Sequence, residues 1–157
     1  KIIKEESLIR ACKDGQDKEA RWNMMMASTE GAMAFSKGLG AVHSMSHAAG
    51  ANQELNLHHG TLNAVILPTI LKFNHNHVGN KYTRIASSMG INKSANLADE
   101  ITKLNEIIGI PNGLAEMGIT EDMIPELVKH SITDPSNITT PRLPTEKEWE
   151  NLFLEAM

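Results

Sequence analysis

The chain has 157 residues, which is the length of one domain with a hydrophobic core of its own. Its 41% hydrophobic and 22% charged residues exclude a disordered tail, and no apolar run is long enough to span a membrane. The net charge of −4, with lysines and arginines scattered along the chain, argues against nucleic acid as a partner.

The single cysteine, Cys12, excludes an internal disulfide and a cluster of thiolate metal ligands. We expect its thiol to be buried and inert, and a reducing cytoplasm fits this cysteine usage. No glycine-rich fingerprint for a nucleotide pyrophosphate occurs in the chain. If the chain belongs to an enzyme with a dinucleotide cofactor, the part that binds this cofactor therefore lies elsewhere.

Helical periodicity dominates, and the alternation typical of strands is nearly missing. Asp17 can cap a helix on which Trp22, Met26 and Met33 share one side. The methionines at 24–26 spread apolar surface around this helix, which predicts that it packs into a core on more than one side. A helix of small residues that carries His43 and His47 is expected next, followed by a connecting loop that ends at Gly60.

The second half continues the helical pattern. Residues 61–74 form a strongly apolar helix in which Pro68 should cause a kink or a local adjustment. Two further helices are predicted near 80–90 and 95–109, and residues 112–131 should form a short turn followed by another helix. The proline-rich segment 132–144 should cross the surface in an extended form. Thr145 and Glu148 form a capping box for a last helix. The sequence thus predicts one compact all-α, multi-helix domain of roughly seven helices.

His43 and His47 are four residues apart, so a helix places both imidazoles on one face. Two imidazoles at this spacing can converge on one metal ion or one substrate. The segment between them lacks the glutamate of the zinc-protease motif. The alternative is that they are two polar residues on a partly exposed helix face.

A third imidazole comes from His58 or His59, just before Gly60. Adjacent residues rarely reach one centre together, and His59 is the better candidate because it directly precedes the glycine. Imidazole suits zinc, iron, copper and nickel alike, and no acidic residue nearby stands out as a further ligand. Glu54 could serve, but its polar loop predicts a solvated side chain.

Three other histidines are expected at the surface, namely His75, His77 and His130, because they lie at helix ends.

These residues also carry a family resemblance. The segment from Ala20 to Asn74 resembles the C-terminal, all-helical domain of the iron-containing alcohol dehydrogenases (group III, or class IV), with a dehydroquinate synthase-like fold. The matching elements are GxxHxxxH, a loop that ends in HG, and xNAxxLPxxxxFN. They fall on His43, His47, His59, Asn63 and Pro68, together with their neighbours, and a looser likeness extends over nearly the whole chain.

The resemblance implies that residues 1–157 are one metal-binding C-terminal domain and that an N-terminal nucleotide-binding domain is missing from this chain. Iron(II), or zinc in some relatives, would be held by His43 and His59 together with an aspartate and a histidine from an upstream D-x-x-x-H helix. His47 corresponds to a histidine of the substrate pocket and is a candidate for proton relay. The cofactor would be NAD or NADP.

The resemblance further implies interconversion of a small alcohol and its aldehyde or ketone, by an enzyme that we expect to be cytoplasmic, free of membrane and a homo-oligomer. This chain alone should be inactive and should bind metal weakly. Ala48 replaces a frequent proline, which puts the shape of the substrate pocket in question. Alternatives are a metal-independent reductase like maleylacetate reductase, a zinc enzyme like glycerol dehydrogenase, and a non-catalytic helical interaction module.

Overall fold

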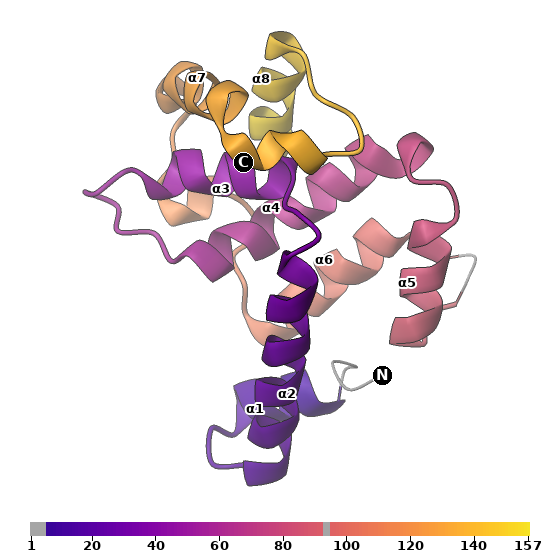
Figure 1. Ribbon diagram of the computed structural model, residues 1–157. Helices are drawn as coiled ribbons and strands as arrows, with labels where there is room; N and C mark the ends of the chain where they lie inside the picture. Colours follow the sequence, from indigo (N-terminus) through magenta and orange to yellow (C-terminus); the bar gives the residue numbers. More distant parts are fainter. Residues whose placement is uncertain (1–5, 93–94) are drawn as a thin grey trace.

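The computed structural model describes residues 6–92 and 95–157, and within these residues it contains helices and no β-strand (Figure 1). The all-α prediction is therefore confirmed. There are eight α-helices in the described residues: α1 Glu6–Lys13, α2 Lys18–Phe35, α3 Ala41–Gly50, α4 His59–Asn74, α5 Lys81–Met89, α6 Leu97–Ile108, α7 Ile124–Thr133 and α8 Glu146–Glu155. Four short 3-10 helices join them: η1 His75–His77, η2 Ala115–Met117, η3 Glu121–Met123 and η4 Pro135–Thr139.

Side chains at the helix ends explain several of these boundaries. The Asp17 carboxylate accepts a hydrogen bond from the Ala20 N–H at the start of α2, as expected. Thr145 and Glu148 form the predicted capping box of α8. Gly90 and Gly109 adopt left-handed conformations that end α5 and α6.

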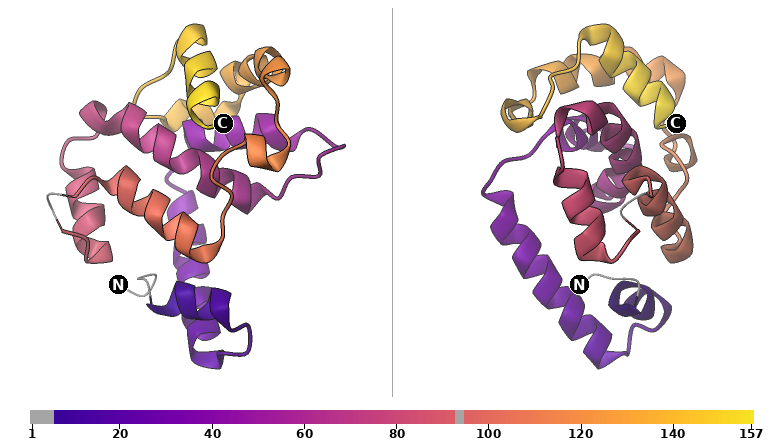
Figure 2. Two further views of the ribbon diagram at one scale, coloured as in Figure 1. Left: turned by 180° about the vertical axis from the view of Figure 1, so that it is seen from behind. Right: turned by 90° about the vertical axis from the view of Figure 1, so that its right-hand side faces the viewer.

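The core lies where α3 and α4 pack against each other and against the C-terminal helices α7 and α8 (Figure 2). Met45 of α3, Leu62 and Ile66 of α4, and Trp149 and Phe153 of α8 are fully buried there. Burial of a large apolar side chain contributes about 1.5–3 kcal/mol, so these residues fix how α3 lies on α4. The helices that carry the three candidate histidines are therefore held by the best-packed part of the molecule.

Pro68 lies inside α4, and the helix continues through it. A proline at this position has no N–H to donate to the carbonyl of Ala64, four residues earlier. The side-chain amide of Asn105 in α6 donates to that oxygen instead, at 2.7 Å. The local adjustment that the sequence predicted is thus a hydrogen bond from a neighbouring helix.

Helix α2 differs from its prediction because its methionine-rich surface is largely exposed. Trp22 is 64% exposed, and Met25, Met26 and Met33 are also exposed, whereas only Ala20 and Ala27 of α2 are buried. The reason is that α2 packs chiefly against α1 and projects with it away from the core (Figures 1 and 2). The expectation of core packing for the methionine run was wrong for this chain.

Two other expectations are corrected. Cys12 is exposed rather than buried, because α1 packs against α2 and α6 and its remaining side faces solvent. The segment 132–144 is not extended throughout, since it contains the last residues of α7 and the 3-10 helix η4, with Ser136 buried. Asp134 caps η4 by accepting the Ser136 N–H, and Pro135 occupies its first position.

Within the described residues, no helix is long and apolar enough to cross a membrane.

Candidate metal centre

Three imidazoles from two helices meet at one edge of the α3–α4 pair. His43 and His47 lie one turn apart on α3, and His59 is the first residue of α4. The ring centroids are 5.3 Å apart for His43 and His59, 5.7 Å for His43 and His47, and 5.4 Å for His47 and His59. The rings of His47 and His59 are nearly parallel, at 17°. The structure therefore brings together the three histidines that the sequence singled out.

Asn63, one turn after His59 on α4, joins two of these rings. Its side-chain nitrogen lies 2.9 Å from Nε2 of His59 and 3.4 Å from Nε2 of His43. An amide N–H donates, so both Nε2 atoms accept and direct their lone pairs towards the same place. Two convergent Nε2 lone pairs are the arrangement that a metal ion requires of a histidine pair.

The imidazole of His43 is suited to bind a metal ion in its neutral form. Burial lowers its pKa, and the neighbouring His59 and His47 lower it further, while Asp134 acts in the opposite direction. Neutral imidazole is the form that ligates a metal ion, because the protonated ring has no lone pair to give. The chemistry of this pair thus fits a divalent transition metal.

The donor set is nevertheless incomplete within the described residues. Among the described residues, no group of three or more His, Cys, Asp or Glu side chains could hold one metal ion. His47 lies beside this pair, and its Nδ1 is engaged by Asp134 at 2.9 Å. The chain can offer His43 and His59, and any further ligands must come from other residues or from solvent.

The other polar candidates lie apart from this cluster. His58 caps α4 by accepting the Thr61 N–H, which separates its role from that of His59. His75, His77 and His130 are exposed, as predicted, and Glu54 is exposed in its loop. Helix α4 begins at His59, so the histidine stands on a helix end rather than in the loop that the sequence predicted.

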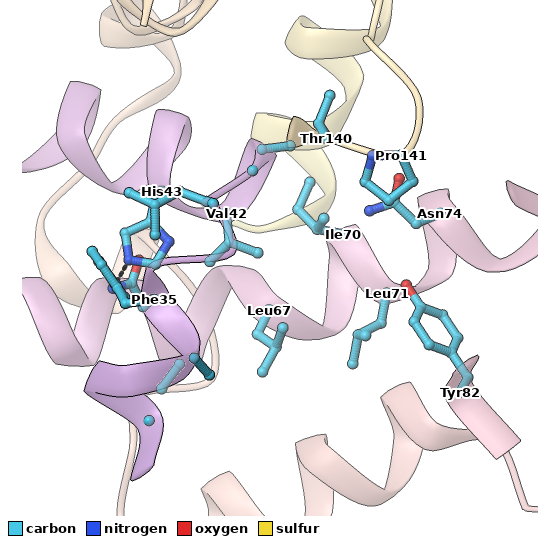
Figure 3. Close-up of a pocket in the computed structure, with 18 residues that line it drawn as sticks. Phe35, Val42, His43, Leu67, Ile70, Leu71, Asn74, Tyr82, Thr140 and Pro141 are labelled. Carbon is cyan, nitrogen blue, oxygen red and sulfur yellow. Dashed lines mark hydrogen bonds between the residues drawn. The ribbon is translucent and has the colours of Figure 1, made fainter. Parts of the chain in front are cut away.

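An apolar cavity of about 510 Å³ opens beside His43 (Figure 3). Phe35 lies against His43, with ring centroids 5.3 Å apart, and Leu67 and Leu71 of α4 line the floor. Tyr82 of α5 lines the far end, where burial raises its pKa against the effect of a hydrogen bond with Asn74. A small apolar molecule in this cavity would have the imidazole cluster at one end.

In the part of the chain that the structure describes, three buried side-chain oxygens of cavity-lining residues have no hydrogen-bond partner: Asn63 Oδ1, Asn74 Oδ1 and Thr140 Oγ1. Such atoms are costly unless another group supplies a donor. Donors from a ligand, from water or from other protein segments would therefore be favoured here.

The residues that support the histidine cluster were not identified from the sequence. Asp134, which caps η4, and Asn137 of η4 follow the histidines by about ninety residues, and they contact His47 and Ser44 of α3. A signal was present, because an Asp followed directly by Pro after an apolar helix indicates a new helical start. Nothing local in the sequence indicated which surface that start would face.

Comparison with known proteins extends these observations. A profile described as the Fe-containing alcohol dehydrogenase family, C-terminal, matches residues 1–157. The 4-hydroxybutyrate dehydrogenase of Cupriavidus necator is 39% identical over 155 residues, which are 94% of this chain and 41% of that protein. The NAD-dependent methanol dehydrogenase of Bacillus methanolicus is 34% identical over 161 residues, or 97% and 42% of the two chains.

Solved structures of relatives have the same fold in this region. A 1,3-propanediol oxidoreductase superimposes with a TM-score of 0.88 at 30% identity, over 96% of this chain and 44% of that one. The chain therefore spans about two fifths of the length of the relatives that it matches. From the match over its whole length, the chain belongs to the iron-containing alcohol dehydrogenase family and corresponds to the C-terminal helical part of its members.

Proposed function

We propose that this chain is the metal-binding helical domain of an NAD(P)-dependent alcohol dehydrogenase that interconverts a small alcohol and its aldehyde or ketone. The observation that carries the proposal is the convergence of the His43 and His59 Nε2 atoms beside Asn63. These two nitrogens would hold iron(II), or zinc, together with ligands from outside residues 1–157. Once bound, such a metal supplies Lewis-acid chemistry that polarises a carbonyl oxygen or lowers the pKa of an alcohol.

The remaining steps are assigned to side chains of this chain. The cavity beside His43, with Phe35 in its lining, binds the carbon part of the substrate and excludes water from it. His47 lies near both proposed ligands, and its side chain is 42% exposed, so it can pass the alcohol proton towards solvent. Hydride transfer requires a nicotinamide, and its binding site is assigned to the part of the parent protein outside this chain.

The relatives support the chemical class of the substrate. Their names include 4-hydroxybutyrate, methanol and 1,3-propanediol dehydrogenases, and one name specifies NAD. We therefore propose a small alcohol as substrate and NAD or NADP as the acceptor. Cytoplasmic location and a homo-oligomeric state are part of the proposal, supported by the lone cysteine and by the exposed apolar side of α2.

The test uses the full-length parent protein. We expect bound iron or zinc by elemental analysis, and NAD(P) reduction that depends on an alcohol such as 4-hydroxybutyrate or 1,3-propanediol. His43→Ala and His59→Ala should lose both the metal and the turnover. His75→Ala is the matched control, since it removes an exposed imidazole far from the cluster, and it should retain both.

Each alternative predicts a different outcome. A metal-independent reductase would keep its turnover after treatment with a chelator and in the His43→Ala variant. A zinc enzyme of the glycerol dehydrogenase type would contain zinc and favour glycerol among the alcohols. An interaction module would show neither metal nor turnover, and that result would refute the proposal. Residues 1–157 produced alone should be inactive.

A further inference from the structure

We infer that Asp134 is a positioning residue that holds His47 in one orientation and one tautomer. The inference rests on the function proposed above, in which His47 relays the proton. It concerns the residue that makes the histidine suitable for that task, and its evidence lies in contacts between α3 and η4.

The contact joins a mostly buried carboxylate to a more exposed imidazole. Nδ1 of His47 lies 2.9 Å from Oδ2 of Asp134, and the side chain of Asp134 is 14% exposed against 42% for His47. Burial raises the pKa of Asp134, but hydrogen bonds from Ser136 and the contact with His47 outweigh it, so the pKa lies below its usual value. An ionised carboxylate only accepts, so Nδ1 carries the hydrogen. In the neutral ring, Nε2 is then left as the free acceptor.

The carboxylate is itself fixed. Its other oxygen, Oδ1, accepts the Ser136 N–H at 2.7 Å, which is the cap of η4. Within η4, Asn137 donates from Nδ2 to the Ser131 carbonyl at 2.7 Å and accepts from the Ser44 hydroxyl at 2.6 Å. Ser44 is fully buried in α3, the helix that also carries His47. These hydrogen bonds therefore fix the position of Asp134 relative to α3 and His47.

A second histidine–carboxylate pair in the chain shows the difference. His130 and Glu126 lie 3.1 Å apart on the single helix α7, and both side chains are more than half exposed. Such an exposed pair contributes little and leaves both groups free to move. The His47 pair instead joins residues 87 positions apart through a mostly buried carboxylate. That is the arrangement expected of a group that orients an imidazole.

The test is Asp134→Asn in the full-length enzyme. Asparagine keeps an oxygen for the Ser136 N–H and is as good a cap, so η4 should fold normally. Its amide group, however, presents hydrogens to Nδ1 of His47, and the ring must move its own hydrogen to Nε2. We expect kcat to fall about 10- to 100-fold, with KM changed by no more than about twofold. Metal content should stay at the wild-type level.

A double-mutant cycle separates positioning from a general structural effect. If Asp134 acts through His47, then Asp134→Asn should change kcat by less than about twofold in a His47→Ala background. The matched control is Glu126→Gln, which alters the exposed pair on α7 and should leave kcat at the wild-type value. Equal losses of kcat in both backgrounds, or full activity of Asp134→Asn, would overturn the inference.

An independent measurement does not require activity. Diethyl pyrocarbonate acylates an imidazole nitrogen that carries a free lone pair, and peptide mapping locates the modified histidine. We expect His47 to react several-fold more slowly in Asp134→Asn than in wild type, with His130 as the internal reference. An unchanged rate at His47 would overturn the inference. Absence of alcohol-dependent NAD(P) reduction by the wild type would instead refute the proposed function.

Discussion

Gly38 shows how one missing side chain brings η4 close to α3. The residue lies between α2 and α3 with a φ of 109°, a conformation that favours glycine. A Cβ atom here would lie 2.3 Å from the Thr139 hydroxyl oxygen at the end of η4. Thr139 in turn donates a hydrogen bond to the Leu39 carbonyl. The absence of a side chain thus lets the segment that carries Asp134 approach the helix that carries His47.

Substitution of this glycine by alanine should be harmful. Gly38→Ala combines a strained φ with a clash between the new Cβ and the Thr139 side chain, so we expect a loss of about 1–3 kcal/mol in the free energy of unfolding. Gly31→Ala is the matched control, because its Cβ meets nothing within 4 Å and the residue lies inside α2. That change should stabilise the helix by about 0.5–1 kcal/mol. Urea unfolding monitors both variants, and equal stabilities would contradict this prediction.

At the same scale, the sequence predicted the imidazoles but not what holds them. The spacing of His43 and His47 and the step from His59 to Gly60 are local signals that periodicity makes readable. Asp134 and Asn137 reach the cluster through the packing of α7 on α3, and such a contact leaves no local trace in the sequence. The roles of His43, His47 and His59 stay predictions until the variants above are measured.

At the scale of elements, α4 and α6 depend on one another through Pro68. The Asn105 amide replaces the N–H that the proline lacks, so Asn105→Ala should leave the Ala64 carbonyl without its donor. We expect a loss of about 1 kcal/mol in the free energy of unfolding. In a Pro68→Ala background the backbone itself supplies the donor, and the same change should cost clearly less. Urea unfolding of the four proteins measures this coupling, and additive effects would contradict it.

The capping box of α8 predicts a pH-dependent stability. Hydrogen bonds from Thr145, above all from its backbone N–H, and the nearby Arg142 hold the pKa of Glu148 below its ordinary value of 4.5. A lowered folded-state pKa stabilises the fold above the unfolded-state pKa and loses that contribution as pH falls through the folded-state value. The stability difference between wild type and Glu148→Gln should therefore be constant near neutral pH and shrink below pH 4.5.

Thermal unfolding between neutral pH and pH 3 gives this difference directly. Glu146→Gln is a suitable control, since Glu146 lies in the same first turn and its carboxylate is outside the box. A difference that grows on acidification would contradict the assignment.

Elements were predictable where a cap or a stripe marks them. Asp17 and Thr145 begin helices, and Gly90 and Gly109 end helices, where the sequence predicted these boundaries. The environment of α2 was not predictable, because periodicity shows which side of a helix is apolar and says nothing of what covers it. The segment 132–144 was misjudged since its prolines mask a short 3-10 helix.

At the scale of the whole molecule, the apolar side of α2 is the most conspicuous surface. Trp22, Met25, Met26 and Met33 are exposed along it, and contiguous apolar patches favour association. Residues 1–157 produced alone should therefore self-associate in a concentration-dependent manner. Sedimentation velocity over a range of concentrations measures this.

Trp22→Lys combined with Met33→Lys should shift the distribution towards the monomer. Ile138→Lys, which changes an exposed apolar residue in η4, is the control and should leave the distribution unchanged. A chain that is monomeric at every concentration would contradict the prediction.

The distance in sequence between the imidazoles and their supports has a consequence for recombining members of this family. A crossover placed in α5 or α6 would transfer all three histidines from one parent and η4 from the other. Such a hybrid inherits its imidazoles intact, yet the positions that contact His47 and Ser44 are filled by residues of the other parent. Exchange between relatives is therefore safest when both stretches come from the same parent, although they lie in opposite halves of the gene segment.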